Sequence, residues 1–146
     1  MSDLAGALPD DWTLPAVTAF NHDWFTSGEI AIQTCEACGT LQHPPEEVCH
    51  ACGAMAFTSS VLPSSGTVHS FTVVHHSVHA ALDQAVPYTV VLVSLDGAPQ
   101  LRVVGNLIGN QAVTIGMPVE AVWQERITED GTKILLPQWQ RAKEGP

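Results

Sequence analysis

Residues 35–53 have the sequence CEACGTLQHPPEEVCHACG, and this stretch decides the fold. It contains all four cysteines of the 146-residue chain, as two Cys-x-x-Cys pairs that are each followed by glycine. The two-residue gap lets a tight turn direct both sulfurs at one ion, and glycine suits the positive φ at which such a turn reverses. Four thiolates at this spacing are typical of a closed, tetrahedral structural zinc site. We therefore predict zinc bound by Cys35, Cys38, Cys49 and Cys52.

Other uses of these cysteines stay open at this point. Two disulfides require an oxidising compartment, and a redox-active Cys-x-x-Cys requires one pair in a βαβ setting. Iron suits a four-sulfur site almost as well as zinc, because softness and geometry separate the two metals poorly. His43 and His50 lie near the motifs, but four cysteines already complete a tetrahedral site. We expect neither histidine to be a ligand.

The length of the chain allows one ordinary domain or two very small ones. The cysteine segment is too short to bury a core, so its metal must supply the folding energy. We predict a lead and helix over residues 1–28, a zinc ribbon over 29–60 and a β domain over 61–146.

The charge of the chain is strongly one-sided, with fifteen acidic residues against five basic ones. The first basic residue is Arg102, so the ribbon has neither lysine nor arginine. Nucleic-acid modules bind by neutralising phosphates with clustered basic residues, so this composition argues against a nucleic-acid partner. The hydrophobic content of 45% is high for so small and acidic a chain, and predicts either a β-rich core or an exposed partner surface.

The sequence has no run of eighteen apolar residues, and we expect no signal peptide, since the first residues include Asp3 and Asp10 rather than a basic cluster. We therefore expect a cytoplasmic protein with no membrane partner, and reduced thiols bound to metal fit that location.

Apolar residues at helical spacing predict a helix over residues 16–27, ended by Gly28. So short a helix must lie on something, either this chain's own ribbon or another subunit. Strands are predicted on both sides of the first cysteine pair, over 29–34 and from Leu41 to the prolines that follow.

The second half of the chain is β-rich. Alternating or β-branched runs predict five strands, over residues 67–75, 88–95, 101–107, 119–127 and 133–139. In the first of these, strict alternation puts Val68 and Phe71 on opposite faces. Gly105 suggests a bulge or bend, and residues 109–116 could hold one helical turn. Five strands with this connector match an OB-type barrel, which removes exposed edges by closure.

The order of these motifs resembles a known family, the zinc-ribbon plus OB-fold proteins associated with acyl-CoA metabolism. The resemblance covers roughly residues 16–140. It is carried by Trp24-Phe25, the two cysteine pairs, His43-Pro44-Pro45, Ser65-Gly66-Thr67-Val68, the SFTVVH run at 70–75, Pro87-Tyr88, Gly116-Met117-Pro118-Val119 and Leu136-Pro137.

The resemblance implies an N-terminal helix, a rubredoxin-like zinc ribbon and a five-stranded OB barrel. It also implies a non-catalytic accessory subunit of a heteromeric thiolase-fold, sterol-carrier-like enzyme that breaks carbon–carbon bonds in a bulky acyl-CoA. Retro-aldol cleavage of a steroid side-chain CoA thioester is the first expectation, and thiolysis of another acyl-CoA is the alternative. The rivals from other classes are a nucleic-acid-binding ribbon/OB module and an iron-containing electron carrier.

Direct binding of a CoA thioester by this chain is a further expectation. Many members of the family have a basic residue after the Pro-Pro pair, where this chain has Glu46. Charge for the CoA phosphates would then come from Arg102, Arg126 or another of the five basic residues, or from the partner. Tyr88 is a candidate for stacking on the adenine, although a barrel aromatic more often belongs to the core.

No residue is assigned a catalytic role. His75, His76 and His79 lie close to Asp83, which would allow a histidine–carboxylate general base or a second metal. Adjacent strand residues point to opposite faces, which favours an exposed polar strand end instead. Trp123 is expected in the core or against a flat ring, and Trp139 as an exposed anchor for a partner.

Overall fold

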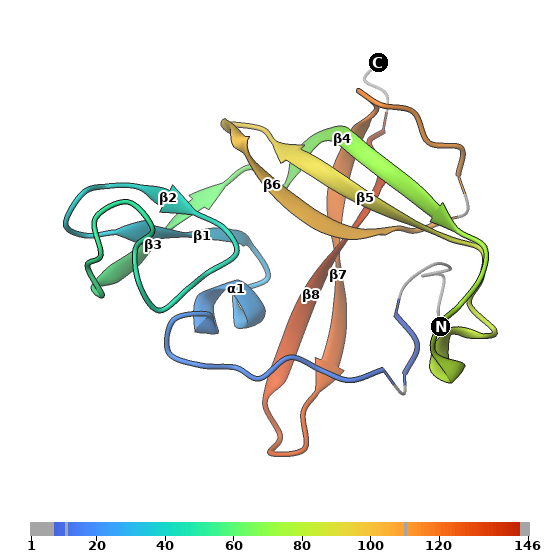
Figure 1. The fold of residues 1–146 in the computed structure, drawn as a ribbon, viewed down its shortest axis with the longest axis horizontal. Coiled ribbons are helices and arrows are strands. Elements are labelled where there is room, and N and C mark those ends of the chain that lie inside the picture. The colour runs from blue at the N-terminus through green and yellow to red at the C-terminus, as the bar shows by residue number, and fades with distance from the viewer. Residues whose placement is uncertain (1–7, 11, 110, 144–146) are drawn as a thin grey trace.

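The computed structural model describes residues 8–10, 12–109 and 111–143. A short helix and a three-stranded ribbon pack beside a closed five-stranded barrel (Figure 1). The elements are α1 (His22–Thr26), β1 (Ile30–Cys35), β2 (Leu41–Gln42) and β3 (Phe57–Leu62) in the first part, then β4 (Ser65–Val74), the 3-10 turn η1 (Ala80–Leu82), β5 (Tyr88–Leu95), β6 (Ala98–Leu107), β7 (Pro118–Ile127) and β8 (Lys133–Arg141). The predicted fold class is confirmed.

Helix α1 is much shorter than the predicted segment of residues 16–27. The side chain of Asn21 explains its late start: Oδ1 accepts from the Thr18 N–H at 2.7 Å, and Nδ2 donates to the Ala16 carbonyl at 3.1 Å. These bonds hold the preceding chain in a turn that competes with a helix. Trp24 is 6% exposed and belongs to this chain's own core, so the helix does lie on its own chain.

The ribbon has a third strand that the sequence analysis missed. β3 pairs with β1 along its whole length, from Ile30 opposite Leu62 to Cys35 opposite Phe57, whereas β2 adds only two residues on the other side. The buried face of β1 presents Ile30 and Ile32, both 0% exposed, to the common core. The ribbon is thereby joined to the barrel by packing as well as by the chain.

The barrel has the strand order β4-β5-β6-β8-β7 and closes between β7 and β4. β6 and β8 meet in parallel at Leu107 opposite Trp139. The expectation that Trp139 is an exposed anchor is therefore wrong, because this pairing puts the indole inside the barrel at 0% exposure. The pairing shows no bulge at Gly105. A Cβ there would lie 2.8 Å from Trp139 Cδ1, so glycine makes room for the indole.

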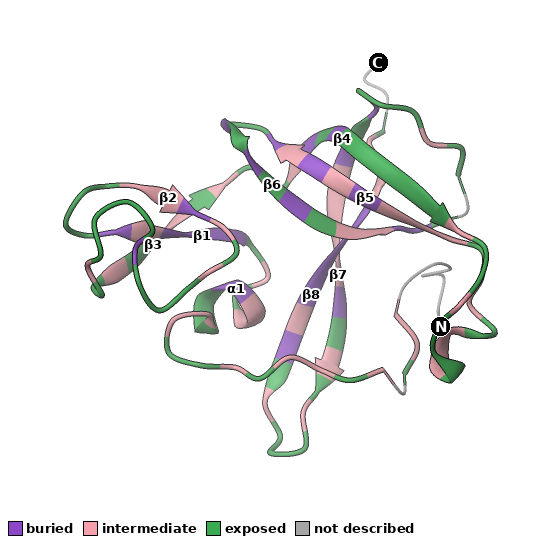
Figure 2. Ribbon diagram, viewed as in Figure 1, coloured by how far each residue is buried: buried purple, intermediate pink, exposed green. Residues whose placement is uncertain are grey.

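Strand β4 departs from strict alternation because its register shifts between Val68 and Ser70. Val68 stands opposite Val93 and Phe71 opposite Val91, so Val68 and Phe71 share a face, contrary to the prediction. Residues 69–73 are all exposed, and Figure 2 shows the second half of β4 almost wholly green. The connector before β7 holds no helix in its described residues, 109 and 111–116.

Residues at the N-terminal end of the described chain are bound to strand β7 of the barrel. Gln124 accepts from the Leu8 N–H at 3.2 Å and donates to the Leu8 carbonyl at 2.9 Å. Arg126 donates to the same carbonyl at 2.7 Å, and its guanidinium lies 3.2 Å from the carboxylate of Asp10. Across the part of the chain that the structure describes, no helix is long and apolar enough to cross a bilayer.

Candidate metal centre

The two cysteine pairs meet at one point. The four Sγ atoms lie within 4.8 Å of one another, with Cys35 and Cys52 3.6 Å apart and Cys38 and Cys49 3.7 Å apart. Four sulfurs at about 2.3 Å from a tetrahedral zinc ion stand about 3.8 Å apart, so the donor set and its spacing fit zinc. The cluster is closed, because four thiolates leave no position for a substrate.

Each pair is shaped by the same turn. The N–H of Gly39 donates to the Cys35 carbonyl and that of Gly53 to the Cys49 carbonyl, both at 2.9 Å. The two glycines have φ values of 75° and 80°, which confirms the role predicted for them. Hydrogen bonds from Thr40, its hydroxyl foremost, lower the pKa of the Cys38 thiol to about 6, which favours a thiolate ligand at neutral pH.

A buried glutamine pair supports the loop between the two turns. Gln33 Oε1 accepts from Gln42 Nε2 at 2.7 Å and from the Glu46 N–H at 2.9 Å, and Gln33 Nε2 donates to the Glu46 carbonyl at 2.6 Å. Gln42 Oε1 in turn accepts from the His50 N–H at 3.0 Å and lies 2.7 Å from His50 Nδ1. The ring of His50 is thus engaged by Gln42, outside the four-sulfur cluster.

His43 also lies outside the cluster. Its ring packs against Trp24 with the centroids 4.3 Å apart, and its Nδ1 is buried with no hydrogen-bond partner in the described structure. Burial lowers the pKa of His43 to about 4, because the charged imidazolium loses its hydration there. His43 is therefore a neutral packing residue between the helix and the ribbon at neutral pH.

The structure does not bring the three CoA candidates together. Arg126 is bound to the Leu8 carbonyl and to Asp10, and Tyr88 lines a cavity of about 170 Å³ that also contacts Leu8. Arg102 is exposed on β6 opposite Ser94. Tyr88 and Ser94 are six residues apart on β5, which is roughly 20 Å along a strand. Arg102 and Tyr88 therefore lie at different ends of this sheet.

The histidines after β4 form no unit with Asp83 among the described contacts. His79 Nδ1 accepts the Ala81 N–H at 3.0 Å and caps η1, and its ring meets Trp12 edge-on at 5.0 Å. His75 and His76 are exposed. Trp123 is partly buried and packs against the core, as one of the two predictions for it stated.

The fold and the site define a class of protein in which a four-cysteine zinc ribbon is joined to an OB barrel. The rubredoxin-like zinc ribbon domain of ChsH2 matches residues 26–58, and the C-terminal OB-fold domain of ChsH2 matches residues 60–124. The chain belongs to this ChsH2 family, which confirms the acyl-CoA-associated family suggested by the sequence. The four cysteines form its zinc-binding site.

Two relatives resemble this chain over most of its length. A solved chain of the Ltp2-ChsH2(DUF35) aldolase has a TM-score of 0.71 and 35% identity, over 88% of this chain and 98% of that chain. The "Probable enoyl-CoA hydratase alpha subunit" of Thermomonospora curvata is 38% identical over 128 residues, which are 84% of this chain. The present chain spans 39% of the length of that curated relative.

Proposed function

We propose that this chain is a non-catalytic accessory subunit of a heteromeric aldolase with a thiolase-fold partner, acting on a bulky acyl-CoA. The observation that carries the proposal is the likeness to a chain of the Ltp2-ChsH2(DUF35) aldolase over nearly that chain's whole length, at 35% identity. Retro-aldol cleavage of a steroid side-chain CoA thioester is our first choice of reaction. Steroid degradation and lipid metabolism would then be its setting.

The partner would supply the catalytic residues for this reaction. In a retro-aldol cleavage the β-hydroxyl loses its proton, the Cα–Cβ bond breaks, and its electron pair becomes the enolate of the shorter CoA thioester, which is then protonated. The partner would stabilise that enolate. Zinc in the ribbon supplies structure rather than chemistry, because its four thiolates leave no open position.

The part played by this chain would be to cover the partner's active site and exclude water. A rigid cover suits the structure, since the ribbon, the helix and the barrel share one core. Direct contact with the CoA thioester, through Arg102, Arg126 or Tyr88, is a secondary proposal. Arg102, which is exposed, is the residue we would test first.

A second function in the same class is a subunit of an acyl-CoA thiolase, where the thiol of CoA attacks a β-ketoacyl-CoA and the same bond breaks. A role beside a hydratase is favoured by the relative named as an enoyl-CoA hydratase subunit. Hydration of a double bond would form the β-hydroxyacyl-CoA that a retro-aldol step consumes. Retro-aldol cleavage, thiolysis and hydration can therefore be told apart by the substrate: a β-hydroxyacyl-CoA, a β-ketoacyl-CoA with free CoA, or an acyl-CoA with a double bond.

The test is to purify the chain from its native host, identify the thiolase-fold enzyme that accompanies it by mass spectrometry, and assay each chain alone and both together. We expect release of a carbonyl product and a shorter acyl-CoA from a steroid β-hydroxyacyl-CoA only when both chains are present. Cleavage only of a β-ketoacyl-CoA with free CoA would support the thiolase alternative. Turnover by this chain alone would refute the accessory role.

A further inference from the structure

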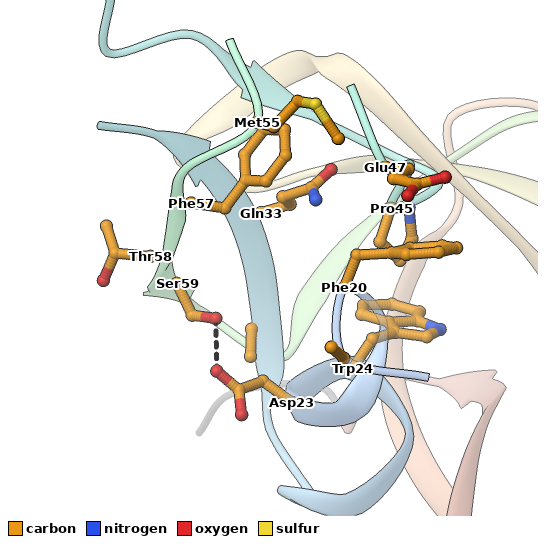
Figure 3. Close-up of a pocket in the computed structure, with 12 residues that line it drawn as sticks. Phe20, Asp23, Trp24, Gln33, Pro45, Glu47, Met55, Phe57, Thr58 and Ser59 are labelled. Carbon is orange, nitrogen blue, oxygen red and sulfur yellow. Dashed lines mark hydrogen bonds between the residues drawn. The ribbon is translucent and has the colours of Figure 1, made fainter. Parts of the chain in front are cut away.

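A cleft of about 370 Å³ opens between α1, the ribbon sheet and the loop that precedes the second cysteine pair. Figure 3 shows Phe20 and Trp24 on one side of it and Phe57 and Met55 on the other. Met55 is 65% exposed, and the rings of Phe20 and Phe57 are only partly covered. Apolar and aromatic walls left open to solvent are typical of a surface that another molecule covers.

The charged groups that line the cleft are all acidic. Asp23 and Glu47 lie at opposite ends of the lining residues in Figure 3, and among the residues that the structure describes no lysine, arginine or histidine lines the cleft. No lysine or arginine precedes Arg102 in the chain, and the basic side chain in contact with Asp23 is that of the adjacent His22, with Nδ1 3.4 Å from Asp23 Oδ1. A cationic group of another molecule would therefore complement these two carboxylates.

The carboxylate of Asp23 is held by hydrogen bonds, and the backbone next to Glu47 is fixed by Gln33. Asp23 Oδ2 accepts from Ser59 Oγ at 2.6 Å, and this bond, with a further one to His22, keeps the pKa of Asp23 below its ordinary value. The side chain of Asp23 is still 61% exposed, which leaves acceptor positions for a donor from solvent. Glu47 follows Glu46, whose backbone N–H and carbonyl are both bound to the buried side chain of Gln33.

We propose that this cleft is the docking surface for a basic segment of the partner subunit, with an arginine side chain placed between the aromatic walls and paired with Glu47. This inference rests on the proposed function. A guanidinium matches the cleft better than an ammonium, because it stacks on aromatic faces and bonds a carboxylate with two parallel donors. The same carboxylates repel the phosphates of CoA. The cleft therefore favours binding of a basic segment of the partner over binding of the acyl-CoA.

The first experiment compares two charge reversals in the purified two-chain complex. Glu47→Lys changes the cleft, and Glu129→Lys makes the same change at an exposed turn between β7 and β8. The dissociation constant is measured by biolayer interferometry at 50 and 500 mM NaCl, on variants shown to retain bound zinc and the wild-type circular dichroism. We expect Glu47→Lys to weaken binding at least tenfold at low salt and Glu129→Lys to stay within about twofold of wild type.

A second experiment identifies the docked residue. A photo-crosslinking amino acid at position 55, in place of Met55, should attach to a partner peptide that contains arginine. Changing that arginine to glutamate should weaken the partner's binding to the wild-type chain. The same change should restore the partner's binding to the Glu47→Lys variant. Equal affinities for Glu47→Lys and Glu129→Lys, or a crosslinked peptide without a basic residue, would overturn the inference while the accessory role stands. Absence of any complex with the wild-type chain would contradict both the docking cleft and the accessory role.

Discussion

The buried ring of His43 makes the fold sensitive to acid in a way that can be calculated. Its Nδ1 has no partner in the described structure, and the cavity of about 530 Å³ beside it is lined by apolar and amide side chains with no charged group. The pKa of His43 falls from an ordinary 6.5 to about 4 on folding. The unfolded chain therefore binds a proton more readily than the folded chain does.

The sign and size of the effect follow from these two pKa values. The contribution of neutral His43 to the free energy of unfolding is fully present above pH 6.5 and is lost as the pH falls from 6.5 towards 4. Below pH 4 this group causes no further loss. Between pH 7.5 and pH 5 the free energy of unfolding should fall by about 2 kcal/mol through His43 alone. Protonation of the zinc thiolates also destabilises the fold in acid, so a matched variant is needed to isolate the histidine.

The assay is urea unfolding at pH 7.5 and pH 5 with excess zinc, for wild type and for His43→Phe, which keeps a ring against Trp24 but cannot be protonated. Both proteins share the loss from the thiolates, and we expect wild type to lose about 2 kcal/mol more than the variant. An NMR titration should place the midpoint of His43 in the folded chain near 4. Equal losses in the two proteins, or a midpoint at or above 6.5, would refute the reasoning.

Three further predictions concern the ribbon and the barrel. Cys49→Ser should abolish stoichiometric zinc binding and unfold the ribbon, measured by metal analysis and circular dichroism; a folded ribbon without metal would contradict the structural role. Gly66→Ala should destabilise the barrel by about 2 kcal/mol or more in thermal melts, because its Cβ would lie 2.3 Å from the Ser94 carbonyl oxygen, whereas the exposed neighbour variant Thr67→Ala should cost far less. Gln33→Ala should cost about 1–3 kcal/mol and speed hydrogen exchange at the Glu46 amide, since buried partners lose their bonds; unchanged exchange would show that the loop holds itself.

The parts of the fold that follow from local chemistry were predictable from the sequence. The cysteine spacing predicted the turns at Gly39 and Gly53, and the β-branched run at 88–95 gave a strand with the observed bounds. The zinc site depends on residues close together in sequence and on one kind of ligand. Such a site can be predicted without knowing the tertiary structure.

What the sequence analysis missed depends on contacts between distant segments. β3 has the sequence FTSSVL, whose middle is polar, and becomes a strand because β1 offers it an edge, with Ser60 Oγ 2.7 Å from Thr34 Oγ1. Trp139 is buried because a parallel contact with Leu107 closes the barrel over it. The acidic cleft joins Asp23 to a loop whose position is set by hydrogen bonds to Gln33, which no periodicity reveals.

The fastening of Leu8 to Gln124 and Arg126 has a consequence for how the molecule melts. It ties the residues before α1 to the hairpin farthest from them in sequence, while α1 and β1 pack into the core that they share with the barrel. Ribbon and barrel are thus coupled at both ends of the helix. Stripping the metal with a chelator should therefore lower the melting temperature of the barrel as well, in one cooperative transition rather than two.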